Sequence, residues 1–261
     1  MLDTKIDFTH SGQYTLTLRL DTDGFAFAVS DPSADEAAPA CEDWAVDESL
    51  SLAANLKRAF AEKDWLARPF RRVNVLMATR RFTLMPLELF EDEQAAEVFY
   101  YNHPRWRNEE VRYNILHNNN LVVLFGIDQS VSGFLRERLS DVRLYAQASP
   151  LLDGFAVKSR LGNTRKMYVH VRRECMDVFC YGQGRFLLGN SYACSQEGDR
   201  LYALLGAWTS LGFDQEQDEL LLCGRVSVGD EWVSGLKQFV RKVSVMPSGV
   251  DIDFQMMAIC E

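Results

Sequence analysis

The sequence predicts an α/β protein built from two tandem lobes with mixed sheets. Two observations predict this class. Apolar runs of β type, such as RVNVLMAT at residues 72–79, alternate with amphipathic helical segments along the chain. The order strand-strand-strand, helix, strand then occurs twice, first from residue 13 and again from Met167. Because consecutive short strands pair antiparallel and a crossover helix joins parallel strands, each copy is expected to form a mixed sheet.

The first copy begins with a hairpin. Residues 13–20 (QYTLTLRL) alternate between apolar and polar side chains, and residues 24–30 form the second strand. Between them, the Asp23-Gly24 pair is a strong hairpin signal. We next expect a third strand near 44–46, a helix capped by Ser49 that ends before Pro69, and a buried parallel strand at 72–79. A short strand closed by Pro86, a helix at 91–102 and a hairpin of 110–116 and 120–128 should follow. The copy is expected to end with a helix at 129–141 and with a strand and helix from Val142.

The second copy repeats this order. Three short strands are predicted in MYVHVRR, CMDVFCYGQ and RFLLGNSYA. They are followed by a helix at 195–212, a buried strand at 219–226, an amphipathic helix at 231–242 with Trp232, Leu236, Phe239 and Val240 on its apolar stripe, and a closing strand in VSVMP. We therefore expect a first lobe at 1–163, with an inserted subdomain at about 80–145, and a second lobe at 164–261.

Composition and charge exclude several classes of protein. The net charge of −9 argues against a nucleic-acid partner, since neutralising phosphates requires clustered Lys and Arg. The short basic runs at 68–72, 80–81 and 172–173 are interpreted as solvated turns. The N-terminus lacks an apolar signal segment and no window approaches about 18 uninterrupted apolar residues, so we expect a cytoplasmic protein without a membrane span. The six cysteines and four histidines show no metal-ligand spacing, and the cysteines are expected to be reduced and mostly buried.

Six segments occur in an order that is typical of one superfamily: VNVLMAT, RFTLMP, LELFEDEQAAEVF, VRYNILHNNNLVVLFGI, DQSVSGFLRERL and VRLYAQASPLLDGF. This order resembles the actin-like ATPase superfamily, whose members have two ribonuclease-H-like lobes. More narrowly, the architecture is similar to PilM of type IV pili and to the cytoplasmic part of GspL of type II secretion. The chain also resembles an uncharacterised bacterial family with this fold, domain of unknown function 3822, which carries no assigned activity. The resemblance implies an actin-like ATPase fold of two tandem ribonuclease-H-like lobes.

The resemblance also implies positions for a nucleotide site. Its first phosphate turn, an acid with glycine between strands one and two, is matched loosely by Asp21, Asp23 and Gly24. Its second phosphate turn, Asp-x-Gly in the second lobe, falls on HVRRECMDV, which has no glycine and no suitably placed aspartate. Its adenosine motif needs two adjacent glycines, but Gly224 is followed by an arginine. One loose match out of three predicts a degenerate site and no cofactor.

Two functions remain open from these residues. The favoured one is non-catalytic, an interaction or scaffold protein that binds a protein or peptide partner by analogy with PilM and GspL. Its candidate interaction residues are Arg105, Trp106 and Arg107, because Trp and Arg dominate binding hot spots. The alternative is a divergent ATP-binding protein or phosphotransferase that binds ATP with Mg²⁺, in which Arg172 or Arg173 contacts phosphate directly.

Two further functions have less support from the residues. A ribonuclease-H-type nuclease needs converging carboxylates, and the strand at 72–79 carries none. A small-molecule sensor that uses a cleft for another ligand remains open. No Ser/His/Asp arrangement is visible, so no catalytic residue is predicted.

Overall fold

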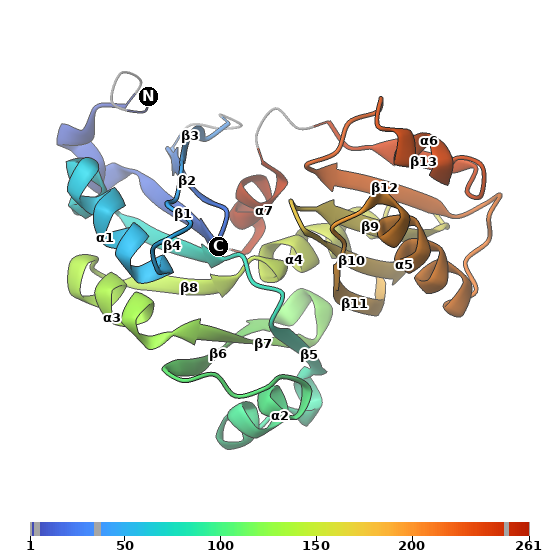
Figure 1. The fold of residues 1–261 in the computed structure, drawn as a ribbon, viewed down its shortest axis with the longest axis horizontal. Helices are drawn as coiled ribbons and strands as arrows, with labels where there is room; N and C mark the ends of the chain where they lie inside the picture. Colours follow the sequence, from blue (N-terminus) through green and yellow to red (C-terminus); the bar gives the residue numbers. More distant parts are fainter. Residues whose placement is uncertain (1, 3–5, 34–37, 248–250, 261) are drawn as a thin grey trace. The chain divides into compact units, whose positions relative to one another are not determined.

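Three β-sheets organise the part of the chain that the computed structural model describes, residues 2, 6–33, 38–247 and 251–260 (Figure 1). The chain divides into two units, the first comprising Met1–Pro150 and Asp253–Ala258 and the second Leu151–Ile252 and Ile259–Glu261. The division falls inside helix α4 (Ala148–Ser159), earlier than the expected boundary at 163/164.

The main sheet of the first unit combines an antiparallel meander with parallel strands. Its order is β3 (Ala40–Trp44), β2 (Gly24–Ser30), β1 (Thr15–Asp21), β4 (Arg72–Met77) and β8 (Val142–Ala146). β1 pairs antiparallel with β2 and parallel with β4, and β4 pairs parallel with β8. The buried parallel strand predicted at 72–79 is therefore the central strand β4, whose apolar run suits a strand covered on both faces.

The two helices associated with this sheet pack against each other through their apolar faces. α1 (Leu52–Glu62) and α3 (Gln129–Arg138) meet through the rings of Phe60 and Phe134, whose centroids lie 5.2 Å apart. The cap of α1 differs from the prediction, because the hydroxyl of Ser51 accepts the hydrogen bond from the Ala54 amide, whereas Ser49 bonds to Asp47. Ser51 prevails because an N-cap must lie directly before the first helical turn.

A smaller sheet is inserted between β4 and β8. Its order is β5 (Phe82–Pro86), β7 (Leu121–Asp128) and β6 (Glu109–Leu116), all antiparallel, with α2 (Ala95–Asn102) packed on it. The core of this part is formed by Ala95, Phe99, Val122 and Leu124. The predicted hairpin of two strands around Asn118-Asn119 is confirmed, and Asn120 closes it in a left-handed conformation.

The sheet of the second unit has the same order and the same strand directions as the main sheet of the first. It consists of β11 (Arg185–Ala193), β10 (Cys175–Gly182), β9 (Arg165–Val171), β12 (Glu219–Gly224) and β13 (Lys242–Val245). α5 (Glu197–Ser210) and α6 (Glu231–Leu236) contribute Trp208 and Trp232 to its core. The prediction that Phe239 is buried was wrong: it is 46% exposed, because α6 ends at Leu236 and the helical spacing is lost beyond it, although Val240 is still buried.

The last helix returns to the first unit. α7 (Ile252–Cys260) places Asp253, fully buried, against β1, where Arg19 Nη1 lies 3.2 Å from both carboxylate oxygens. Gln147 Nε2 donates to the same carboxylate at 2.7 Å, and the Arg19 guanidinium lies over the ring of Phe254. These contacts explain why residues 253–258 belong to the first unit although they follow the second in sequence.

No helix in the described ranges has the length and apolar character needed to span a membrane. The cysteines that the structure describes are mostly buried, as expected: Cys175, Cys180, Cys194 and Cys223 are buried, and Cys41 is exposed.

Candidate functional site

The β1–β2 turn carries three of the predicted site residues, Asp21, Asp23 and Gly24. Antiparallel pairing runs up to Asp21 opposite Gly24, so Thr22 and Asp23 form the turn and Gly24 is already part of β2. The Asp21 carboxylate accepts a hydrogen bond from the Thr22 amide at 2.7 Å and another from its hydroxyl. The hairpin is confirmed, but the Asp-Gly pair does not occupy its two central positions.

The conformation of Gly24 shows that the turn does not depend on glycine. Its φ is not positive, and neither Thr22 nor Asp23 is among the residues with a left-handed backbone. A Cβ added at Gly24 would meet its nearest neighbour, the Trp44 carbonyl oxygen, at 3.7 Å, an ordinary contact. The turn is thus not the glycine-dependent type that an Asp-Gly pair predicts in a two-residue hairpin.

The corresponding turn of the second unit, between β9 and β10, lies next to a buried carboxylate. The strands end and begin at Val171 and Cys175, and the Arg172 amide donates to the Cys175 carbonyl at 2.9 Å. Two residues into β10, Asp177 is only 2% exposed, and it lies opposite His170 on β9. Cross-strand neighbours share a face of the sheet, which is why these side chains meet.

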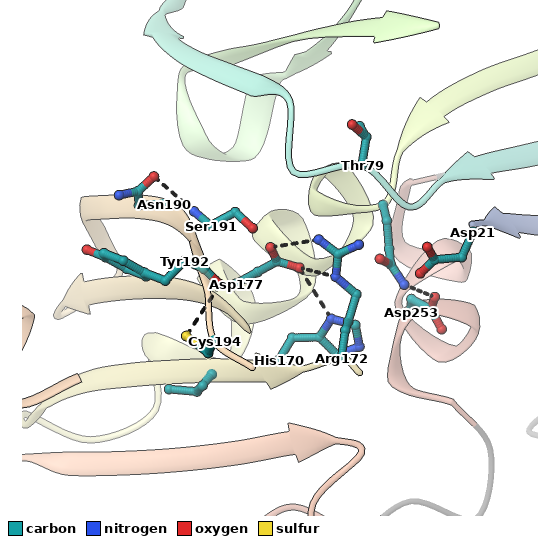
Figure 2. Close-up of polar contacts among 12 residues, drawn as sticks. Asp21, Thr79, His170, Arg172, Asp177, Asn190, Ser191, Tyr192, Cys194 and Asp253 are labelled. Atoms are coloured by element: carbon teal, nitrogen blue, oxygen red, sulfur yellow. Dashed lines mark hydrogen bonds and ion pairs between the residues drawn. The ribbon is translucent and has the colours of Figure 1, made fainter. Parts of the chain in front are cut away.

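Arg172 folds back over this carboxylate. Its Nη2 donates to Asp177 Oδ1 at 3.2 Å and its Nε lies 3.2 Å from Oδ2, while His170 Nδ1 lies 3.6 Å from Oδ2 (Figure 2). Arg172 is buried, at 8% exposed. The interpretation of residues 172–173 as a solvated turn was therefore wrong for Arg172 and right for Arg173, whose side chain is exposed.

The electrostatics of this cluster favour an ionised carboxylate. Burial by itself would raise the pKa of Asp177, but the positive charge of Arg172 and the close contact with His170 outweigh it and hold the pKa below its ordinary value. The cluster of Arg172, His170 and Asp177 was not predicted from the sequence. The available signal was the alternation of β9 and β10, which places His170 and Asp177 at paired positions once the turn is located.

Gly224, the candidate of the adenosine motif, lies at the carboxyl end of β12 next to the same turn. Its φ is +83°, and a Cβ there would lie 2.4 Å from the Val171 carbonyl oxygen and 2.9 Å from His170 Cδ2. The following residue, Arg225, donates its amide to the Val171 carbonyl at 2.8 Å. A glycine is needed here for the close approach of β12 to β9, whether or not a ligand binds.

The predicted nucleotide residues thus fall into two groups. Asp21, Asp23 and Gly24 lie in the first unit, whereas Arg172 and Gly224 come together in the second, at the carboxyl ends of β9 and β12. Among the described residues, no three His, Cys, Asp or Glu side chains gather in a way that would hold a metal ion.

A pocket of about 650 Å³ lies within the first unit. It is lined by Thr22 of the β1–β2 turn, by residues 77–81 at the end of β4, by residues 106–109 at the start of β6 and by residues 126–128 at the end of β7. Trp106 and Arg107, two of the candidate interaction residues, therefore line the same pocket as the β1–β2 turn. Arg105 lies outside this lining, with its guanidinium 4.6 Å from the ring of Tyr100.

Residues 3–243 match the model of a family described as "Protein of unknown function (DUF3822)". The chain belongs to the DUF3822 family. The predicted resemblance to this family is confirmed. A crystal structure from Bacteroides thetaiotaomicron, described as a protein with actin-like ATPase fold and unknown function, is 48% identical, with a TM-score of 0.93 over 98% of this chain and 99% of that one. The actin-like fold predicted from the order of elements is therefore correct.

A second solved structure, the PilM-PilN type IV pilus biogenesis complex, matches this DUF3822 protein with a TM-score of 0.60. The identity is 13%, and the match covers 94% of each chain. At this identity the likeness shows the shared fold alone. No curated protein matches the chain.

Proposed function

We propose that this protein is a non-catalytic interaction or scaffold protein of the cytoplasm, built on an actin-like fold whose nucleotide site has degenerated. The observation that carries the proposal is the ion pair of Arg172 with Asp177. At the turn where the superfamily resemblance implies a phosphate clamp, the available cation binds a carboxylate of its own chain.

The energetics of that ion pair oppose its use for phosphate. If Arg172 turned toward a ligand, Asp177 would lose its main partner while remaining buried, which typically costs about 3–5 kcal/mol. A ligand with a Kd of 1 mM binds with only about −4 kcal/mol. The cost of leaving the carboxylate buried without this partner would therefore offset most of the binding free energy of a weakly bound nucleotide.

The interaction part of the proposal rests on the segment after α2. Trp106 is 60% exposed and Tyr101 is 90% exposed, and Arg105 and Arg107 flank the tryptophan. Aromatic and arginine side chains of this kind dominate protein-protein hot spots. The solved PilM structure, which is similar to this chain, is described as a complex of PilM with a second protein, PilN. By analogy, we favour a polypeptide partner for this protein.

Calorimetric and thermal-unfolding titrations with Mg-ATP test the degenerate site. We expect no binding heat and no rise in Tm at low-millimolar ATP. A functional site occupied at 100 times Kd would stabilise the protein by about 2.7 kcal/mol. A clear rise in Tm with Mg-ATP, lost in an Asp21→Asn variant, would contradict the proposal.

Affinity capture with matched variants tests the partner surface. Wild-type protein, Trp106→Ala and Tyr202→Ala are each used as bait in a lysate of Bacteroides thetaiotaomicron, the source of the 48% identical relative. Tyr202 is the control because it is 84% exposed on α5, far in sequence from the proposed surface. We expect one partner that both wild type and Tyr202→Ala retain and Trp106→Ala loses. Equal capture by all three baits would remove this surface from the proposal.

The alternative function is a divergent ATP-binding protein or phosphotransferase that uses Mg²⁺. Its candidate residues are Asp21, Asp23 and Gly24 in the first unit, and Arg172 or Arg173 together with Gly224 in the second. One observation favours it: Asp21 lies at the carboxyl end of β1, and open α/β sheets bind ligands at this end of their strands. The Mg-ATP titration distinguishes the two functions.

A further inference from the structure

The pocket of the first unit has the size and the floor of a small-molecule site. Its volume of about 650 Å³ lies within the usual range of about 300–1,000 Å³ for such sites. Leu20, Met77 and Ile127, at the ends of β1, β4 and β7, line it and are buried. This floor offers an apolar contact surface on rigid strands.

One wall of the pocket is a tryptophan held in place by its neighbours. The Arg81 guanidinium lies 3.8 Å from the centroid of the Trp106 ring. Arg81 itself is fixed by Glu109, with Nη2 and Nε donating at 2.8 and 3.2 Å to its two oxygens, and by the Pro104 carbonyl at 2.7 Å. The indole is still 60% exposed, so a planar ligand can lie against it.

Gly126 makes this arrangement possible. A Cβ at this position would overlap the carboxylate group of Glu109, which occupies the space beside β7. With glycine there, the Glu109 side chain is only 4% exposed and its charge is neutralised by Arg81. The interpretation of residues 80–81 as a solvated turn is therefore wrong for Arg81 and right for Arg80.

Besides the paired Arg81 and Glu109, the lining carries one negative side chain, Asp128, and two positive ones, Arg80 and Arg107. Asp128 caps α3 by accepting hydrogen bonds from the Ser130 and Val131 amides and from Asn108 Nδ2. Arg80 and Arg107 are exposed, and neither forms an ion pair with another residue in the described ranges. On a protein with a net charge of −9, two such arginines beside an apolar floor mark a place for a negative ligand.

The lining favours a carboxylate over a phosphate. The amides at the start of α3, which would suit a phosphate, are already occupied by the Asp128 carboxylate, and this charge repels a dianion. A single carboxylate matches the planar fork of one arginine.

We propose that this pocket binds a small aromatic carboxylate, with its ring against Trp106 and the floor of Leu20, Met77 and Ile127, and its carboxylate toward Arg80 and Arg107. The proposal goes beyond the interaction function and does not depend on it. The ligand covers part of the tryptophan that the proposed partner would contact.

The test compares 2-naphthoate with its neutral analogue 2-naphthamide on the full chain, by ligand-observed NMR and calorimetry. We expect saturable one-to-one binding of 2-naphthoate and affinity at least about tenfold lower for the amide, the factor that corresponds to about 1.4 kcal/mol. Arg80→Gln and Arg107→Gln should each weaken the acid several-fold and leave the amide unchanged. Trp106→Leu should weaken both compounds.

Arg105→Gln is the matched control, because this neighbouring exposed arginine stacks on Tyr100 and does not line the pocket. It should leave the binding of both compounds unchanged, and Tm measurements establish that all variants fold. Absence of 2-naphthoate binding, equal affinity for acid and amide, or equal loss in Arg105→Gln and Arg107→Gln would overturn the proposal. Tighter binding of AMP, or of the peptide acetyl-Leu-Asp-Leu-amide, with the same dependence on Arg80 and Arg107 would also overturn it, in favour of a phosphate or a polypeptide ligand.

Discussion

The β1–β2 hairpin of the first unit and the β9–β10 hairpin of the second occupy the same place in two sheets of identical strand order. In the first, the turn is short and polar, and its Asp21 carboxylate accepts hydrogen bonds from the amide and hydroxyl of Thr22 in the turn. In the second, the turn folds an arginine back over a buried aspartate. The shared topology determines where the strands end, but the polar side chains near those ends determine which contacts form there, hydrogen bonds within the turn in the first unit and an ion pair with a buried aspartate in the second.

The largest expected effect comes from breaking the buried cluster. Asp177→Ala removes the carboxylate that Arg172 and His170 contact while both of these side chains stay buried, which should lower the free energy of unfolding by about 3–5 kcal/mol. Urea denaturation measures the loss, and hydrogen exchange should place it in β9 and β10. A loss below about 1 kcal/mol would mean that the cluster contributes little to the second unit.

A smaller effect is expected from the glycines that the two units place near these turns. Gly224→Ala should destabilise by about 1–3 kcal/mol from backbone strain alone, since its φ is +83° and its Cβ would meet the Val171 carbonyl. Gly24→Ala is the matched control and should change stability by less than about 1 kcal/mol, because its φ is not positive and its surroundings have room. Similar losses of stability in both variants would contradict the conclusion that only Gly224 is needed for its backbone conformation.

The pH dependence of stability should also differ between the units. The folded pKa of Asp177 lies below its unfolded value of about 3.8, so its ionised form stabilises the protein above that pH. This contribution is lost as the pH falls through the folded pKa. Between pH 7 and 3, wild type should therefore lose more stability than Asp177→Asn, as measured by urea denaturation at each pH. Equal losses would show that Asp177 is not the responsible group.

The smallest effect is expected at the β1–β2 turn. Asp21→Asn keeps an oxygen that accepts from the Thr22 amide at a half-buried position, so we expect the free energy of unfolding to change by about 1 kcal/mol or less. Thermal unfolding should therefore show little change in Tm. A loss as large as that of Asp177→Ala would mean that the two turns are not different in kind.

Much of the fold could be predicted from periodicity. The run at 72–79 became the central strand β4, and the alternation at 13–20 became β1, because each pattern buries its apolar side chains in only one way. The errors lie where a local pattern ends. Phe239 matched the helical stripe but follows the end of α6, and Ser49 is a good cap two residues before the one that the helix uses.

The site was less predictable, because its residues meet through pairing and not through spacing. The flanking arginines of Trp106 were a usable signal for its pocket. Arg81, Glu109 and Gly126, which hold that tryptophan, are brought together by the registers of β5 and β6 on β7. Arg172 was predicted to be an exposed cation of a turn, because nothing in the sequence indicates that its side chain folds back onto Asp177.

By itself the sequence determined the class of the fold, the order of its elements and the family, since these depend on local apolar patterns that only a few arrangements can bury. Only the tertiary structure decided which of the arginines are paired and which line a pocket. Arg172, in the β9–β10 turn, and Arg81, just before β5, are each bound to a carboxylate, whereas Arg80 and Arg107 line a pocket. The difference arises because the partner of a charge is set by turn conformation, strand register and close packing, none of which can be read from the spacing of residues along the chain.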